Sequence, residues 1–104
     1  MISMEYTVFE IIKQMGITPG MAVMSLKGHD KGRIYLVIQN EGSFVKLADG
    51  RLRGLGNLKK KRNSHVKTLG QAAEFDNIRQ LYKLNEDDAN ANIRMIIDEF
   101  LSMN

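Results

Sequence analysis

Short apolar runs separated by glycine-rich turns fill the middle of the chain, and this pattern is typical of β-strands. Five such runs lie at residues 21–26, 33–40, 44–48, 51–55 and 65–69. The Asp-Gly pair at 49–50 is a strong hairpin signal, so we expect the third and fourth runs to pair antiparallel. Several short strands at regular spacing indicate a barrel or sandwich rather than an open sheet.

The second run has apolar side chains at alternating positions on both of its faces. Ile34, Leu36 and Ile38 share one face, because successive side chains of a strand point to opposite sides. Tyr35 and Val37 share the other face. These residue types also have high β-propensity, so we expect a strand here.

A helical pattern precedes the strands. Thr7 and Glu10 fit a capping box, in which each side chain bonds to a free backbone N–H of the first turn. Apolar residues then recur at helical spacing, at Val8, Ile11, Ile12 and Met15. Gly16 is well placed to end this short helix in a left-handed cap. The prediction is an N-terminal helix that braces the strands.

Helical spacing returns after Gly70 and predicts two more helices. The first spans 72–83, with a stripe of Phe75, Ile78, Leu81 and Tyr82. The second starts at Asn85, an N-cap residue followed by carboxylates that suit the positive end of the helix dipole. Its amphipathic stripe contains Ala89, Ile93, Ile96, Ile97, Phe100 and Leu101. That stripe can pack on the N-terminal helix, on the barrel or on a second copy of the chain.

Together these elements predict a mainly β fold with flanking helices. The 104 residues suffice for one compact core and a helical appendage. We expect an N-terminal helical extension at 1–19, a small β-barrel at 20–69 and a C-terminal helical segment at 70–104. No run approaches the ~20 apolar residues of a membrane span, and the N-terminus lacks a signal-peptide pattern. Since the chain also has no cysteine, we expect a cytoplasmic location away from membranes.

Charge is distributed unevenly over these three parts. The whole chain carries a formal charge of +3 at pH 7, but residues 20–69 hold eleven basic and three acidic residues and carry +8. Residues 1–19 carry −1, and residues 70–104 carry −4. A basic central part beside an acidic helical part indicates a surface for a polyanion.

The candidate RNA-contacting residues lie in the turns and strand ends of the basic part. They are Lys27, His29, Lys31, Arg33, Arg51, Arg53, Lys59, Lys60, Lys61, Arg62, His65 and Lys67. Lysine and arginine neutralise phosphates and release condensed counterions, which dominates sequence-independent affinity. Gly28 and Gly32 leave the first loop open for close backbone approach. Arg51 and Arg53 share one face of the fourth predicted strand, so both can point at one phosphate track. A run like 59–62, taken alone, is usually only a solvated loop.

The same residues carry a family resemblance. The chain resembles a KOW motif, a short β-hairpin unit of SH3-like barrels, at Gly20, Val23, Gly28, Asp30, Lys31, Gly32 and Arg33. It is similar to the bacterial KOW-domain RNA-binding proteins at Ala48, Asp49, Gly50, Arg51, Arg53, Leu55, Lys59, Lys60, Lys61, Arg62, His65 and Val66. Those proteins in turn resemble a KOW-bearing large-subunit ribosomal protein family of archaea and eukaryotes. The resemblance covers about half of the chain and implies an SH3-like barrel that binds ribosomal or other structured RNA.

Two positions depart from the family pattern. His29 stands where the family usually has arginine, and its mostly neutral imidazole should make a phosphate contact weaker and pH-dependent. Leu58 stands where a proline usually precedes the lysine run, which should loosen the chain there. Both terminal helical segments lie outside the matched region.

Other side chains suggest less specific roles. Tyr35 and Phe44 can stack on unpaired bases, although aromatic residues in short strands are more often core. His29 and His65 are too few and too far apart in sequence to indicate a metal site. His65 can either pack at the base of the basic loop or touch RNA. Asp49 is more typical of a turn former than of a catalytic carboxylate.

Two interpretations of function remain, and catalysis is not among them. The sequence has no nucleophile–base pair, phosphate-cradling motif or metal constellation, so we expect neither an enzyme nor a cofactor. We predict an RNA-binding module that recognises shape and phosphate. The alternative is a protein-interaction module, because SH3-like barrels often bind peptides and the last helix offers an apolar face.

Overall fold

The computed structural model describes residues 16–103, and the N-terminal helix expected before Gly16 lies outside them. The described elements are β1 (Met21–Ser25), β2 (Ile34–Asn40), β3 (Phe44–Ala48), β4 (Lys59–Arg62), the 3-10 turn η1 (Asn63–His65), β5 (Val66–Gln71), α2 (Phe75–Leu81) and α3 (Glu86–Ser102). The strands therefore come first and two helices follow, in the order that the sequence pattern predicts.

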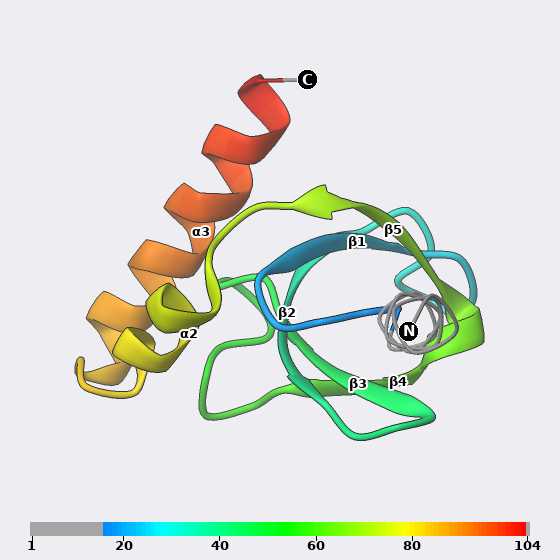
Figure 1. The fold of residues 1–104 in the computed structure, drawn as a ribbon, viewed down its shortest axis with the longest axis horizontal. Coiled ribbons are helices and arrows are strands. Elements are labelled where there is room, and N and C mark those ends of the chain that lie inside the picture. The colour runs from blue at the N-terminus through cyan, green and yellow to red at the C-terminus, as the bar shows by residue number, and fades with distance from the viewer. Residues whose placement is uncertain (1–15, 104) are drawn as a thin grey trace, which may run out of the picture.

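The five strands form one antiparallel sheet in the order β4-β3-β2-β1-β5. The sheet curls strongly, and Figure 1 shows it as an open ring beside the helices. Irregular register between Ala22 and Val23, and between Val37 and Gln39, contributes to the curl, because bulges bend and twist a strand. Within residues 16–103 no pairing joins β4 to β5, so the barrel predicted from the sequence is not closed.

The central strand β2 separates two apolar clusters. Tyr35 and Val37 face the inner side of the curled sheet. They pack there with Ile17, Val23, Val45, Leu47 and Val66. Leu36 and Ile38 face the outer side and pack with Ala48 and the buried residues of both helices. The predicted assignment of the two faces of β2 is therefore confirmed.

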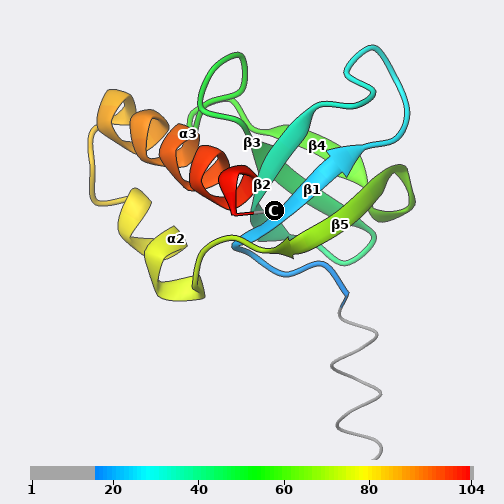
Figure 2. The ribbon, with the colours of Figure 1, turned by 90° about the horizontal axis from the view of Figure 1, so that it is seen from above.

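Both helices cover the outer side of the sheet (Figure 2). α3 buries Ala89, Ile93 and Ile97 in the outer cluster, so the sheet is what its apolar stripe packs against. Asn85 caps this helix as predicted, because its side chain accepts a hydrogen bond of 2.8 Å from the backbone N–H of Asp88. Because its buried side chains belong to the outer cluster, α3 is packed on the sheet.

α2 is shorter than the predicted helix over 72–83. The backbone N–H groups of Ala72 and Ala73 both donate to the carbonyl of Gly20, which keeps these residues out of the helix. Ile78 and Leu81 are buried as the stripe predicts. The other two members of that stripe are exposed: Phe75 is 57% exposed and Tyr82 is 53% exposed.

Two segments of the basic part differ from their predictions. Residues 51–55, expected to be a strand, form turns because one oxygen of Asp49 accepts the backbone N–H groups of Arg51 at 2.8 Å and Arg53 at 2.9 Å. Those N–H groups are therefore not available for a strand ladder. The strand that pairs with β3 is instead β4, Lys59–Arg62. The sequence pattern predicts a loop at these residues, and that prediction is wrong.

Candidate nucleic-acid interface

The β1–β2 loop, residues 26–33, is a compact turn with exposed basic side chains. Gly28 and Gly32 have φ angles of 93° and 90°, a backbone conformation that glycine adopts readily and other residues do not. The loop presents Lys27, His29 and Lys31 to solvent. None of these three side chains has a hydrogen bond or an ion pair with any residue from 16 to 103.

Asp30 points from this loop into the protein and organises a buried hydrogen-bond cluster. Its carboxylate accepts from the hydroxyls of Tyr35 at 2.7 Å and Ser25 at 2.9 Å, and from the ammonium of Lys61 at 3.0 Å. Burial alone would raise the pKa of Asp30, but these donors and the charge of Lys61 hold that pKa well below its usual range. Burial and the hydrogen bond to Asp30 raise the pKa of Tyr35 to about 12.

Lys61 therefore belongs to the interior of the protein rather than to its exposed basic surface. The register places Lys61 opposite Val45 and Lys59 opposite Leu47, so both lysines point to the inner side of the sheet. Lys61 is 9% exposed, and its ion pair ties β4 to the β1–β2 loop. We do not include it in the candidate interface.

The outer side of β4 carries the other half of the lysine run. The Nζ of Lys60 lies 4.7 Å and the guanidinium carbon of Arg62 lies 5.0 Å from the centre of the Phe44 ring, within cation–π range. Glu41 approaches Lys46 at 3.3 Å and Lys60 at 3.9 Å. β4 is an edge strand, and lysines on an edge discourage pairing with another sheet. We call Phe44, Lys46, Lys60 and Arg62 the outer strip. Its basic side chains contact Phe44 and Glu41 and protect an edge strand, so their charge is explained without an RNA contact.

The segment between β3 and β4, residues 49–58, contacts the end of the β1–β2 loop at Arg33. The carboxylate of Asp49 is 3.9 Å from the guanidinium of Arg33, which joins the two segments. Asp49 is a turn former as expected, but its turn replaces the tight hairpin predicted at 49–50. Arg51 is exposed, and its guanidinium has no partner among residues 16–103. Arg53 donates instead to Asn57 at 3.2 Å. Figure 2 shows both segments on the same side of the sheet.

α3 holds residues 49–58 in place through close contacts. The backbone N–H of Leu55 donates to the side chain of Asn90 at 2.9 Å, and the guanidinium of Arg94 donates to the carbonyl of Gly50. A Cβ at Gly50 would lie 2.4 Å from the carbonyl oxygen of Asn90. The helix therefore approaches the segment too closely for any side chain at position 50.

The twelve predicted residues consequently fall into separate groups. We call Lys27, His29, Lys31, Arg33 and Arg51 the basic end, since two neighbouring segments joined by the Arg33–Asp49 contact carry them. Lys60 and Arg62 belong to the outer strip, Lys59 and Lys61 face inward, and Arg53 is bonded to Asn57 within residues 49–58. His65 is half-buried in η1, where its carbonyl accepts from the N–H of Leu26 at 2.8 Å, and Lys67 is exposed on β5.

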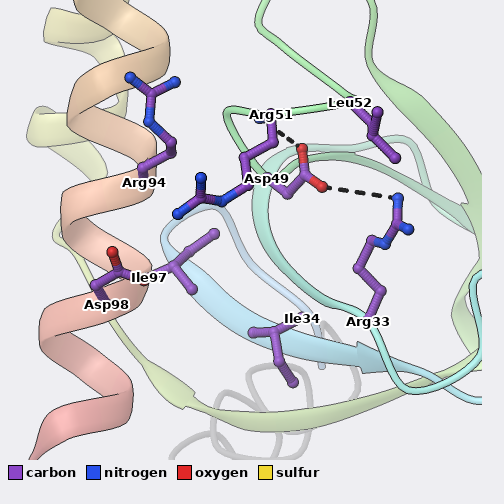
Figure 3. Close-up of a pocket in the computed structure, with 8 residues that line it drawn as sticks. All are labelled: Arg33, Ile34, Asp49, Arg51, Leu52, Arg94, Ile97 and Asp98. Carbon is purple, nitrogen blue, oxygen red and sulfur yellow. Dashed lines mark hydrogen bonds and ion pairs between the residues drawn. The ribbon is translucent and has the colours of Figure 1, made fainter.

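A hollow of about 260 Å³ lies between residues 49–52, the start of β2 and α3 (Figure 3). Its charged lining comes from the arginines Arg33, Arg51 and Arg94 and the carboxylates Asp49 and Asp98. Ile34, Leu52 and Ile97 supply an apolar wall. The hollow adds an arginine of the C-terminal helix to a surface that otherwise comes from the basic part of the chain.

Arg94 was not among the predicted site residues, although the sequence contains a signal for it. Asn90, Arg94 and Asp98 are spaced four residues apart, so they form a polar row along one side of a helix. That row borders the buried stripe that contains Ile93 and Ile97. Polar residues that border a buried stripe lie close to the surface on which the helix packs, so they can bond to neighbouring loops, as Asn90 and Arg94 do here.

Comparison with known proteins adds no family to these observations. No family model matches the chain, and no curated protein matches it either. Among residues 16–103, no three His, Asp or Glu side chains gather in an arrangement that would hold a metal ion. No helix in that range is both long and apolar enough to cross a membrane.

Proposed function

We propose that this protein is an RNA-binding module that contacts phosphates through the basic end. The observation that carries the proposal is the Arg33–Asp49 contact of 3.9 Å, which joins the β1–β2 loop to residues 49–58. This contact links two segments of the chain that both carry exposed basic side chains. Three of them, Lys27, Lys31 and Arg51, have no carboxylate partner among residues 16–103.

Cations gathered without partners repel one another, and a polyanion removes that repulsion. Binding of phosphates also releases the counterions condensed on the nucleic acid, which supplies most of the sequence-independent affinity. Two carboxylates close to the basic end are already engaged within the protein: Asp30 accepts from Tyr35, Ser25 and Lys61, and Asp49 accepts backbone N–H groups and pairs with Arg33. Among residues 16–103, no carboxylate of α2 or α3 forms an ion pair with a basic residue of the sheet.

The resemblance to KOW-domain RNA-binding proteins supports the same proposal from the sequence. It points to ribosomal or other structured RNA as the partner, with recognition of shape and phosphate rather than of base sequence. The open five-stranded sheet with two helices is compatible with this resemblance.

The test compares two double variants that remove the same charge from different places. Lys31→Gln/Arg51→Gln removes two cations of the basic end, and Arg79→Gln/Lys83→Gln removes two exposed cations after the sheet. We expect the first variant to lower RNA affinity at low salt about tenfold or more. Its log–log salt slope should become shallower by about 0.7 for each single-strand phosphate that the variant no longer neutralises. The second variant should keep the wild-type slope, and equal reductions in both would count against the basic end.

The exposed apolar residues of the helices favour a second candidate, a protein-interaction module. Phe75, Tyr82, Leu84, Met95 and Leu101 are between 41% and 57% exposed, and a second hollow between α2 and α3 contains Leu84 and Ile96. This surface would take another protein or a second copy of the chain. Binding there should persist at high salt, because apolar burial is not screened. Sedimentation of the protein alone and after Met95→Lys distinguishes self-association from a monomer.

A further inference from the structure

The hollow beside α3 differs from the rest of the basic end in having both cations and an apolar wall. Three guanidinium groups come to it from three different parts of the chain: Arg33 before β2, Arg51 in the turn after β3, and Arg94 on α3. Figure 3 shows the side chain of Arg51 extending from its turn toward α3. A planar guanidinium can bind a phosphate with two parallel hydrogen bonds, so this grouping suits a phosphate ester.

The three arginines are not equally available to a ligand. Arg94 is held by the carbonyl of Gly50, and Arg33 is 3.9 Å from the carboxylate of Asp49. Arg51 has no partner among residues 16–103 and is exposed. Arg51 is therefore the group most ready to bind an anion, while the other two form a positively charged frame around it.

The apolar wall and the size of the hollow define what else the ligand must carry. Leu52 is 68% exposed at the rim, an unfavourable position for a leucine that a ligand could cover. The volume of about 260 Å³ is below the ~300–1,000 Å³ of pockets for drug-sized molecules, so the hollow would enclose one part of a ligand while the rest lies against its rim. The Asp98 carboxylate can accept a hydrogen bond from a base amino group or a ribose hydroxyl.

We propose that this hollow binds one unpaired nucleotide of the RNA, with its phosphate on Arg51 and its base or ribose against Leu52. Sequence-specific proteins commonly read RNA at unpaired nucleotides, whose bases are free to leave the stack. This inference rests on the proposed function, and it narrows that function to structured RNA with an unpaired nucleotide near a phosphate track.

The test uses two hairpin RNAs with the same stem, one of which carries a single unpaired adenosine. Fluorescence anisotropy measures the affinity of each RNA for the wild type and for the variants Arg51→Gln, Leu52→Ser and Arg53→Gln. Arg53→Gln is the matched control, because Arg53 lies in the same turn but does not line the hollow. Leu52→Ser changes no charge and alters an exposed side chain, so its effect reports contact with the ligand rather than electrostatics or folding.

We expect the wild type to bind the hairpin with the unpaired adenosine about tenfold more tightly than the plain hairpin. Leu52→Ser should lower this preference at least about threefold while leaving the affinity for the plain hairpin unchanged. Arg51→Gln should reduce both affinities and the preference, and Arg53→Gln should keep the preference. Equal wild-type binding of both hairpins, or an unchanged preference in Leu52→Ser, would overturn this inference alone. Absence of binding to either RNA at low salt would overturn the proposed function and this inference with it.

Discussion

The ion pair between Asp30 and Lys61 should be a major source of stability, and separate removal of each partner tests this. The two side chains are 11% and 9% exposed, and they join the β1–β2 loop to an edge strand 31 positions away in sequence. Lys61→Met keeps the length of the stem and removes the ammonium. Asp30→Asn keeps the shape and removes the negative charge.

The expected cost follows from what each variant leaves behind. Removal of one partner of a buried pair typically costs ~3–5 kcal/mol, because the remaining charge is no longer compensated. In Lys61→Met the Asp30 carboxylate still accepts from Tyr35 and Ser25, which lowers the expected cost to about 2 kcal/mol. In Asp30→Asn the Lys61 ammonium can turn toward solvent at the sheet edge, so we expect about 2 kcal/mol again.

Urea unfolding followed by circular dichroism measures these costs. With an m-value of about 1 kcal/mol/M for a small domain, each variant should lower the urea midpoint by about 2 M. The double variant should cost less than the sum of the single variants by about 1 kcal/mol or more, because the partners are in contact. A coupling energy below about 0.5 kcal/mol would refute the assigned role of the pair.

The pH dependence provides a second check on the same pair. The pKa of Asp30 is lowered in the folded state, so its stabilising contribution is present above the unfolded value of about 3.9 and is lost as the pH falls below it. The stability difference between the wild type and Asp30→Asn should therefore be complete at neutral pH and shrink in acid. A difference that stays constant from neutral pH to strong acid would contradict this reasoning.

Two further predictions concern a hydroxyl and a turn. Tyr35→Phe should cost about 1.5–3 kcal/mol at neutral pH, since Tyr35 donates to a charged group. Because the pKa of Tyr35 is raised to about 12, its contribution is present below about pH 10 and is lost as the pH rises through 12, so urea unfolding should show this difference shrinking in alkali. Gly50→Ala should destabilise more than Gly42→Ala by at least about 1 kcal/mol in thermal unfolding. Both glycines have positive φ, 77° and 79°, but a Cβ would meet the carbonyl oxygen of Asn90 only at Gly50. Equal destabilisation by the two variants would contradict this prediction, because it would mean that α3 can move away from position 50 without cost.

The sequence predicts those elements whose pattern is local. The two faces of β2 follow from strict alternation between positions 34 and 38, and each face then meets its own cluster. The start of α3 follows from Asn85, whose side chain acts within its own first turn. In both places the determining interactions lie within a few residues of one another.

The errors occur where a distant or side-chain partner decides the local structure. The Asp-Gly pair at 49–50 suggests a tight hairpin, but the Asp49 carboxylate occupies the N–H groups that the return strand would have used. The basic run of β4 is indistinguishable by composition from a solvated loop. It is a strand because Val45 and Leu47 of β3 pair with it, and because Asp30 compensates the charge of the buried Lys61.

The sequence identifies the basic residues of the candidate site but not the contacts that bring them together, because those contacts join distant parts of the chain. Lys27, His29, Lys31, Arg33 and Arg51 were identified from residue type, and their grouping depends on the contact between Arg33 and Asp49. The contribution of α3 could not be predicted, since it requires the docking of the helix on Gly50, Gly54 and Gly56. Only the folded chain brings Arg94 to the hollow.

Binding of ribosomal RNA and of an unrelated duplex RNA, titrated across salt concentration with the wild-type protein, tests the central proposal most directly. We predict that log Kobs falls linearly with log salt concentration, by about 0.7 for each single-strand phosphate contacted. Three or more such phosphates at the basic end should therefore give a slope of about −2 or steeper, with tighter binding of ribosomal RNA. No binding at low salt, or an affinity that does not change with salt, would contradict an RNA-binding role for the basic end.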